Sequence, residues 1–226
     1  MKWKAVLFDA TGTLIEVREP VALSYARFAQ SHGVDLAPAR IDEAWNRVVA
    51  SRELRCFPDA RPQDVPDLER KWWHEVVRAT FHAADASVVF PDFDAFFAEL
   101  FAWYATADAW RTRPGVITTL TRLRETGLRL GIISDFDYRL TDVLESLEIA
   151  GFFDAVVLAG SVGATKPDPR IFAATLTAMA LSEAEAVYVG DDPVRDLAGA
   201  EAAGIAAVDI TALSTFTNLP ERLATL

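Results

Sequence analysis

The sequence predicts an α/β protein with a doubly wound parallel sheet and an inserted four-helix domain. Three observations support this class. First, five short apolar segments show little alternation, as is typical of parallel strands that are covered on both faces. Second, helical segments separate the last four of these strands. Third, four successive segments with helical periodicity lie between the first strand and the second.

The sheet and its helices are predicted from this alternation. Strands are expected at residues 4–10, 128–135, 154–160, 186–192 and 206–211. Helices are expected at residues 114–127, 137–151, 168–180 and 193–204. Gly127 is typical of a helix end, and Asp168 with Pro169 is typical of a helix start.

The inserted segment is predicted to be entirely helical. Its four helices are expected at residues 20–33, 38–54, 66–84 and 91–110, each opened by a proline. We therefore expect a helical domain at 17–110 and a second domain made of 1–16 and 111–226. Five of the six tryptophans lie in the insert. We expect them to form its own core, although some could face a substrate cleft or a partner chain.

Composition narrows the classes of function. The chain has 226 residues and a net charge of −11, which argues against nucleic acid or an anionic membrane as the main partner. A single cysteine, Cys56, cannot form an internal disulfide and fits a reducing cytoplasm. The N-terminus does not read as a signal peptide, and no apolar run approaches the roughly 20 residues of a membrane helix. We expect a cytoplasmic monomer or homodimer.

Polar residues of the kinds that catalysis uses follow four of the predicted strands. Ligands bind at the carboxyl ends of the strands in open α/β sheets, so these side chains are expected at one edge of the sheet. Taken singly, each could be a helix cap, a turn residue or a solvated charge. Together they indicate a site. They are Asp9, Ser134, Asp135, Lys166, Asp191, Asp192 and Asp196.

Four segments carry a family resemblance. "FDATGTL", "IISD", "TKPDPRIF" and "VYVGDDPVRDLAGAEAAG" resemble the four motifs of the haloacid-dehalogenase superfamily of hydrolases. The resemblance implies a Rossmann-like catalytic core with the helical insert as an α-helical cap. Within the insert, "IEVREPVALSYARFAQSHGV" and "KWWHEVVRATF" resemble the branch called haloacid-dehalogenase-like hydrolase domain-containing protein three.

The resemblance implies a phosphohydrolase that acts on a small phosphorylated metabolite. Asp9 would be the nucleophile that forms an aspartyl-phosphate, and Lys166 would offset the repulsion between two anions. Gly12 would let the backbone amides of its turn face the phosphate. The residues expected to contact phosphate are Gly12, Thr13, Ser134, Asp135 and Lys166.

The resemblance also implies Mg²⁺, a hard ion that prefers oxygen ligands. Asp9, Asp191 and the carbonyl of Thr11 would bind it. Asp196 would bind a metal-bound water or fix Lys166. For Asp192, a role near the metal and a role as a helix cap are both open.

Thr11 departs from the family pattern, because most phosphatases of this superfamily carry an aspartate there as general acid and base. A threonine hydroxyl does not exchange a proton near neutral pH, so we expect slow hydrolysis of alkyl phosphates. A good leaving group would remove the need for an acid. Asp135 or Asp137 could replace the acid, or catalysis is not the protein's role.

Two rival functions follow. In a metal-independent 2-haloacid dehalogenase, the aspartate would attack a carbon atom of the substrate and no metal ion would be needed. The several acids of "GDD…D" would then repel one another without a cation to offset their charge. A catalytically weak protein that binds phosphometabolites or a partner chain would retain the fold without turnover.

Overall fold

The computed structural model describes residues 2–52 and 56–226. Its main sheet has five strands in the order β5-β4-β1-β6-β7, and all four pairings are parallel. The strands are β1 (Ala5–Phe8), β4 (Arg129–Ser134), β5 (Ala155–Leu158), β6 (Ala186–Gly190) and β7 (Ala206–Asp209). In the centre, Leu7 lies between Gly131 and Tyr188. All five predicted strands are confirmed, and with them the doubly wound parallel sheet.

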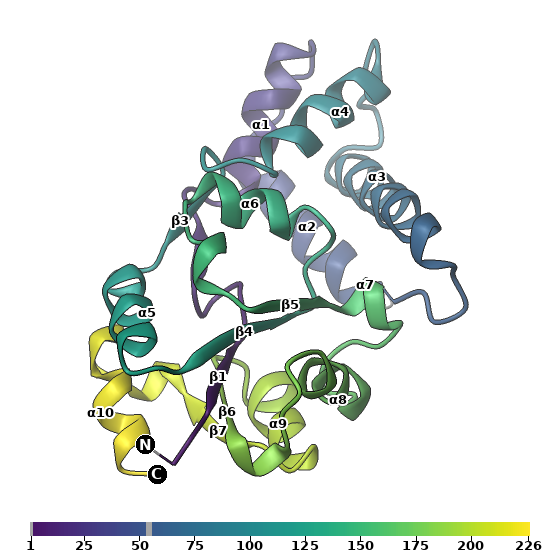
Figure 1. Cartoon of the computed structure of the whole chain (residues 1–226). Helices are drawn as coiled ribbons and strands as arrows, with labels where there is room; N and C mark the ends of the chain where they lie inside the picture. Colours follow the sequence, from purple (N-terminus) through teal and green to yellow (C-terminus); the bar gives the residue numbers. More distant parts are fainter. Residues whose placement is uncertain (1, 53–55) are drawn as a thin grey trace.

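Helices cover both faces of this sheet (Figure 1). One hydrophobic core lies under α5 (Val116–Glu125), α6 (Leu140–Ser146) and α10 (Leu219–Ala224), and it contains Val6 and Phe8. The other core lies under α8 (Pro169–Ala178) and α9 (Gly199–Ala202), and it contains Ala5 and Leu7. Successive residues of β1 thus enter opposite cores, which explains why the strand is apolar without alternation.

Between residues 18 and 109 the described chain forms four longer helices, at the edge of the sheet where the strands end (Figure 1). They are α1 (Val21–Ser31), α2 (Pro38–Ser51), α3 (Val65–Ala84) and α4 (Phe93–Trp103). All four predicted helices are present, but the last one ends at Trp103 and not at Trp110. Residues 53 and 54 of the second predicted helix lie outside the described residues. The four helices share a core of their own that is rich in aromatic rings.

A small antiparallel sheet joins the insert to the rest of the molecule. It consists of β2 (Ile15–Val17) and β3 (Trp110–Thr112), and Glu16 pairs with Arg111 in its register. Their side chains form an ion pair at 2.8 Å. The sequence analysis missed both strands, because three residues are too few to show a periodicity. Trp110 packs in the core of the main sheet, not in the core of the insert as predicted.

Other differences concern element ends. The third predicted strand ends at Leu158, and the next residues form α7 (Ala159–Val162), where Gly160 lies against Glu69 so closely that a Cβ atom would meet the carboxylate at 2.5 Å. The predicted helix at 193–204 is π-helical over Pro193–Ala198 before α9 begins. Short 3-10 turns were not predicted; they lie at Pro62–Asp64, Ala150–Phe152, Glu183–Glu185, Ile210–Ala212 and Phe216–Asn218. Among the residues described, no helix is both long and apolar enough to span a bilayer.

Candidate active site

A cavity of about 460 Å³ lies where the main sheet meets the helical insert. Its floor is formed by side chains that follow the strands of the sheet. Asp9 follows β1, Ser134 ends β4, and Asp191 follows β6. Lys166 and Asp196 complete the floor. The structure therefore brings together the residues that the sequence places at four separate strand ends.

Lys166 is the centre of this group. Its ammonium Nζ donates to Asp9 Oδ1 at 2.5 Å, to Asp196 Oδ1 at 2.6 Å and to the Tyr188 hydroxyl at 3.2 Å. The side chain is only 4% exposed, so these contacts replace the water that a lysine otherwise keeps. The sequence analysis missed Tyr188, which lies inside β6 and reads there as an ordinary apolar strand residue.

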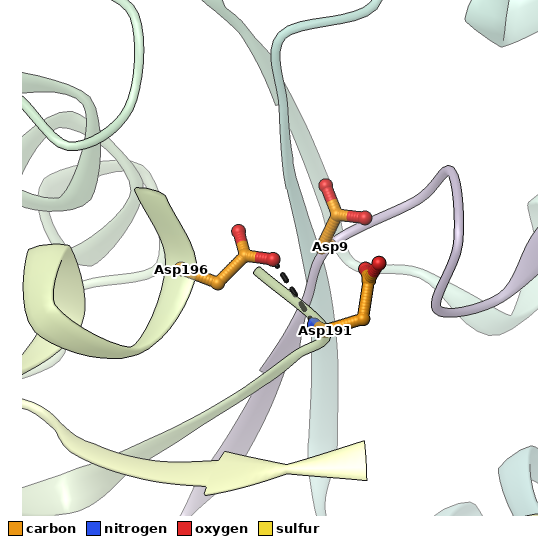
Figure 2. A group of neighbouring side chains, drawn as sticks. All are labelled: Asp9, Asp191 and Asp196. Carbon is orange, nitrogen blue, oxygen red and sulfur yellow. Dashed lines mark hydrogen bonds between the residues drawn. The ribbon is translucent and has the colours of Figure 1, made fainter. Parts of the chain in front are cut away.

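Asp196 fixes both the lysine and the end of β6. Its Oδ2 accepts from the backbone N–H groups of Asp191, as Figure 2 shows, and of Asp192. Gly190 is required by this approach, because a Cβ atom there would lie 2.5 Å from the Asp196 side chain. Both oxygens of Asp196 are thus engaged, which matches the expectation that Asp196 fixes Lys166.

The loop after β1 positions Asp191. Thr13 is fully buried, and its Oγ1 donates to Asp191 Oδ1 at 2.9 Å. Gly12 has φ +94°, and a Cβ atom there would meet Asp191 Oδ2 at 2.5 Å. The Gly12 amide donates to the Ile15 carbonyl at 2.8 Å. That the other amides of this turn face a phosphate stays a prediction. The glycine provides the turn and the space that the Asp191 carboxylate occupies.

Burial and the neighbouring charges together raise the pKa of Asp9 to about 7. Burial raises it most, Lys166 opposes the rise, and Asp196 and Asp191 add to it. For Lys166, burial lowers the pKa, but Asp9, Asp196 and Asp135 raise it more, so it lies above its usual range. One ammonium group therefore faces an excess of carboxylates at the cavity floor.

This excess of negative charge fits a divalent cation. Asp9, Asp191 and Asp196 each offer an oxygen, and these oxygens lie within 4.8 Å of one another. Figure 2 shows the three side chains converging from the end of β1, the end of β6 and the helix that follows β6. Carboxylate oxygens are the ligands that Mg²⁺ prefers. Both oxygens of Asp196 accept hydrogen bonds, whereas Lys166 contacts only Oδ1 of Asp9, so Asp9 and Asp191 are better suited than Asp196 to direct contact with the ion.

Ser134 and Asp135 lie beside the cluster. The Ser134 Oγ accepts from the Phe136 amide at 3.1 Å, which leaves its own O–H to donate into the cavity. Asp135 Oδ1 accepts from the Lys166 backbone amide at 3.0 Å and so fixes the lysine loop. Burial raises the pKa of Asp135 above its usual range.

Thr11 lines the cavity, but Asp137 is held away from any acid role. Asp137 is fully buried and accepts two hydrogen bonds from the Arg139 guanidinium, at 2.8 and 2.6 Å. It also accepts from Trp73 Nε1 at 2.6 Å, and Arg139 donates to the Phe101 carbonyl at 2.9 Å. The pair thus connects the loop after β4 to α3 and α4 of the insert. Its geometry argues against Asp137 as a replacement for the missing acid.

Asp192 is a helix cap in this structure. Its Oδ1 accepts from the backbone amides of Val194 and Arg195, and its Oδ2 accepts from Arg195 Nε at 3.1 Å. These bonds lower its pKa. Of the two roles left open for this residue, the structure shows the cap, and it caps the π-helical turn that carries Asp196.

The helical insert forms the opposite side of the cavity. Six of its ring-bearing residues line the space, and we call them the aromatic wall: Tyr25, Trp45, Trp73, Phe97, Phe101 and Tyr104. Trp45 and Trp73 are parallel, at 3°, with centroids 6.0 Å apart. Helical periodicity did not reveal these residues, because the face of each helix that borders the cavity depends on how the helices pack together. Some tryptophans therefore do face a cleft, the alternative raised for them.

The fold and the cavity floor define a Rossmann-like α/β enzyme with a helical insert. The family model of the haloacid dehalogenase-like hydrolases matches residues 3–204. The chain therefore belongs to the haloacid dehalogenase-like hydrolase family, as the four motifs predict. A mouse protein, haloacid dehalogenase-like hydrolase domain-containing protein 3, is 32% identical over 208 residues, which cover 91% of this chain and 80% of that protein. The similarity to this branch is thus confirmed.

Two solved structures share this fold. A haloacid dehalogenase-type (HAD) phosphatase from Thermococcus onnurineus is 25% identical, with a TM-score of 0.64 and 97% coverage of both chains. The L-2-haloacid dehalogenase from Xanthobacter autotrophicus is 21% identical, with a TM-score of 0.62, and the match covers 99% of this chain and 84% of that one. The second likeness shows the fold alone.

Proposed function

We propose that the protein is a Mg²⁺-dependent phosphohydrolase that acts on a small phosphorylated metabolite through an aspartyl-phosphate at Asp9. The observation that carries the proposal is the buried ammonium of Lys166, 2.5 Å from Asp9 and 2.6 Å from Asp196. An anionic nucleophile can approach an anionic phosphate only where positive charge offsets their repulsion. The similarity to the Thermococcus onnurineus phosphatase supports the same class of reaction.

The proposed reaction has two steps. An Asp9 oxygen forms a bond to phosphorus, the bond from phosphorus to the leaving oxygen breaks, and that oxygen keeps the electron pair. Water then attacks the aspartyl-phosphate, which releases inorganic phosphate and restores the Asp9 carboxylate. Ser134 donates to a phosphoryl oxygen, and Lys166 neutralises part of its charge. Mg²⁺ bound at Asp9 and Asp191 would supply further positive charge there.

Thr11 sets a limit on this reaction. It lines the cavity floor but carries no group that titrates near neutral pH. General acid catalysis typically contributes about 10²–10⁴-fold. We therefore propose slow turnover of alkyl phosphates, whose leaving oxygen needs a proton.

A metal-independent dehalogenase is the second candidate, because the aromatic wall beside Asp9 would also accept a haloalkyl group. The dehalogenase reaction, however, has no role for the carboxylates that are gathered around Asp191 and Asp196. Chloride release from 2-chloropropionate in EDTA would favour it.

Hydrolysis of p-nitrophenyl phosphate tests the proposal, since its leaving group needs little protonation. We expect turnover with Mg²⁺, loss of turnover in EDTA and recovery when Mg²⁺ is restored. Asp142→Asn is the matched control for carboxylate changes, because Asp142 is exposed and lies outside the cavity lining. Turnover that persists in EDTA, or none with any phosphate ester, contradicts the proposal.

A further inference from the structure

We propose that the substrates are aryl phosphate monoesters, whose phosphoryl group binds at Asp9 and whose ring lies against the aromatic wall. This inference rests on the proposed phosphohydrolase function and names its substrate class. It follows from two independent features: the chemistry of the cavity wall and the residue at position 11.

The aromatic wall presents mostly apolar surface to the cavity, because its rings carry only four polar atoms and two of these are used within the protein. Trp73 Nε1 donates to Asp137 at 2.6 Å, and the Tyr104 hydroxyl lies 2.7 Å from Ser24 Oγ. Trp110, which also lines the cavity, donates to the Tyr104 carbonyl at 2.9 Å. A sugar or a polyol would lose water at such a wall and would gain few hydrogen bonds in return.

The two arginines of the described chain that line the cavity already have carboxylate partners in the protein. Arg195 donates to Asp192 Oδ2 at 3.1 Å. Arg139 lines the cavity, but its guanidinium donates to Asp137 and to the Phe101 carbonyl, and it lies 3.6 Å from the Phe101 ring centroid. A second anionic group on the substrate would have to compete with a buried ion pair for this arginine. The substrate body is therefore expected to be apolar as well as uncharged.

The wall is suited to rings in particular. Trp45 is parallel to Trp73 and meets Tyr25 edge to face, at 75° and 5.3 Å. Aromatic pairs in stacked or edge-to-face geometry are worth about 0.5–1.5 kcal/mol beyond the area that they bury. An aromatic substrate gains this contribution, whereas an alkyl chain of equal area does not.

Thr11 points to the same class through leaving-group chemistry. In the first step the bond from phosphorus to the leaving oxygen breaks, and the electron pair stays on that oxygen. A phenolate, with a conjugate acid of pKa about 10, carries this charge and takes its proton from solvent afterwards. An alkoxide is far more basic, as is hydroxide, since water has a pKa of about 15.7. A site with threonine at this position therefore selects for aryl esters.

Steady-state kinetics with 1-naphthyl phosphate and acetyl phosphate test the inference. Acetyl phosphate has the better leaving group but no ring. Any preference for the naphthyl ester can therefore be attributed to contacts between its ring and the aromatic wall. We expect kcat/KM for the naphthyl ester to be at least about tenfold higher. Trp45→Leu should lower this ratio about threefold to tenfold, which is the size of an aromatic contact. Trp72→Leu is the control, since Trp72 neighbours Trp73 but does not line the cavity.

Binding measurements extend the test to phosphonates, which the protein cannot hydrolyse, and to variants that have no activity. Titration calorimetry should show that phenylphosphonate binds more tightly than hexylphosphonate and methylphosphonate. Hexylphosphonate equal to phenylphosphonate would mean that the wall selects for apolar bulk, and the aryl proposal would be wrong. Acetyl phosphate turnover without a naphthyl preference would also overturn the inference while leaving the phosphohydrolase intact. Absence of turnover with both compounds would instead reject the phosphohydrolase itself.

Discussion

The two sides of the cavity differ in what holds them together. On the floor, Asp9, Lys166 and Asp196 are joined by hydrogen bonds of 2.5 and 2.6 Å, and each is almost fully buried. On the aromatic wall, Trp45 contacts Tyr25 and Trp73 through its ring and is only partly buried, and the wall is joined to a charged group by the hydrogen bond from Trp73 Nε1 to Asp137. Hydrogen bonds between charged groups fix positions closely, whereas apolar contacts tolerate changes of shape. The floor is suited to one reaction, and the wall is suited to selection among substrates.

Asp9→Asn should have the largest effect on activity, and it should distinguish the role of the floor in catalysis from the role of the aromatic wall in binding. The amide cannot attack phosphorus, so we expect kcat for p-nitrophenyl phosphate to fall on the order of 10⁴-fold or more, the scale seen when a nucleophile is removed. Binding of phenylphosphonate should persist, because the wall is unchanged. A stopped assay measures the loss of kcat, and calorimetry measures whether the affinity for phenylphosphonate is kept. A variant that retains more than a hundredth of the activity would remove Asp9 from the mechanism.

Asp137→Asn tests the buried pair that connects floor and wall. It leaves the Arg139 guanidinium buried without its carboxylate, and breaking such a pair typically costs about 3–5 kcal/mol of stability. Urea denaturation should show this loss. The exposed pair of Arg122 and Glu221 provides the control, and Glu221→Gln should cause little change.

The double variant Asp137→Asn with Arg139→Met refines the same test. If the pair itself is responsible, the double variant should be more stable than the sum of the two single losses predicts. Purely additive losses would show that the contacts to Trp73 and Phe101, rather than the ion pair, connect the two sides.

The same contrast explains what the sequence could and could not predict. Asp9, Ser134, Lys166 and Asp191 were predicted as a group because each follows a local strand signal, and parallel strands bring their ends together whatever the side chains. The aromatic wall has no such signal. Trp72 and Trp73 are adjacent in the chain, yet only Trp73 lines the cavity, because the packing of α3 against α2 decides which ring faces inward.

Gly12 shows a different limit of sequence reasoning. The glycine was predicted as a turn residue, and its φ of +94° confirms that it needs the left-handed region. Its second role, to leave room for the Asp191 carboxylate, joins residues 179 positions apart and becomes visible only in the folded chain. The use of its amide by Ile15 likewise depends on how the loop closes.

Thr11→Asp tests whether the lack of an acid at position 11 limits the hydrolysis rate of alkyl phosphates. Supplying an acid at this position should speed hydrolysis of an alkyl ester such as glycerol phosphate by about 10²-fold, the lower end of general acid catalysis. The naphthyl ester needs no such proton, so its rate should change much less. Parallel kcat measurements on both esters distinguish the outcomes. An equal change on both would mean that position 11 acts through charge or geometry and not as an acid.

Metal binding should give the smallest effect, and it reports on the floor without any substrate. Mg²⁺ that binds the folded chain at 100 times its Kd contributes about 2.7 kcal/mol, and each kcal/mol shifts Tm by roughly 2–4 °C at this chain length. Thermal unfolding should therefore show Tm rising by about 5–10 °C with saturating Mg²⁺. Asp191→Asn should abolish the rise, because Asp191 is one of the two carboxylates best placed for the ion. Trp45→Leu should preserve it, since that ring belongs to the wall. If Tm still rises with Mg²⁺ in Asp191→Asn, the ion binds elsewhere. The phosphohydrolase proposal would then have to stand without a metal ion at Asp9 and Asp191.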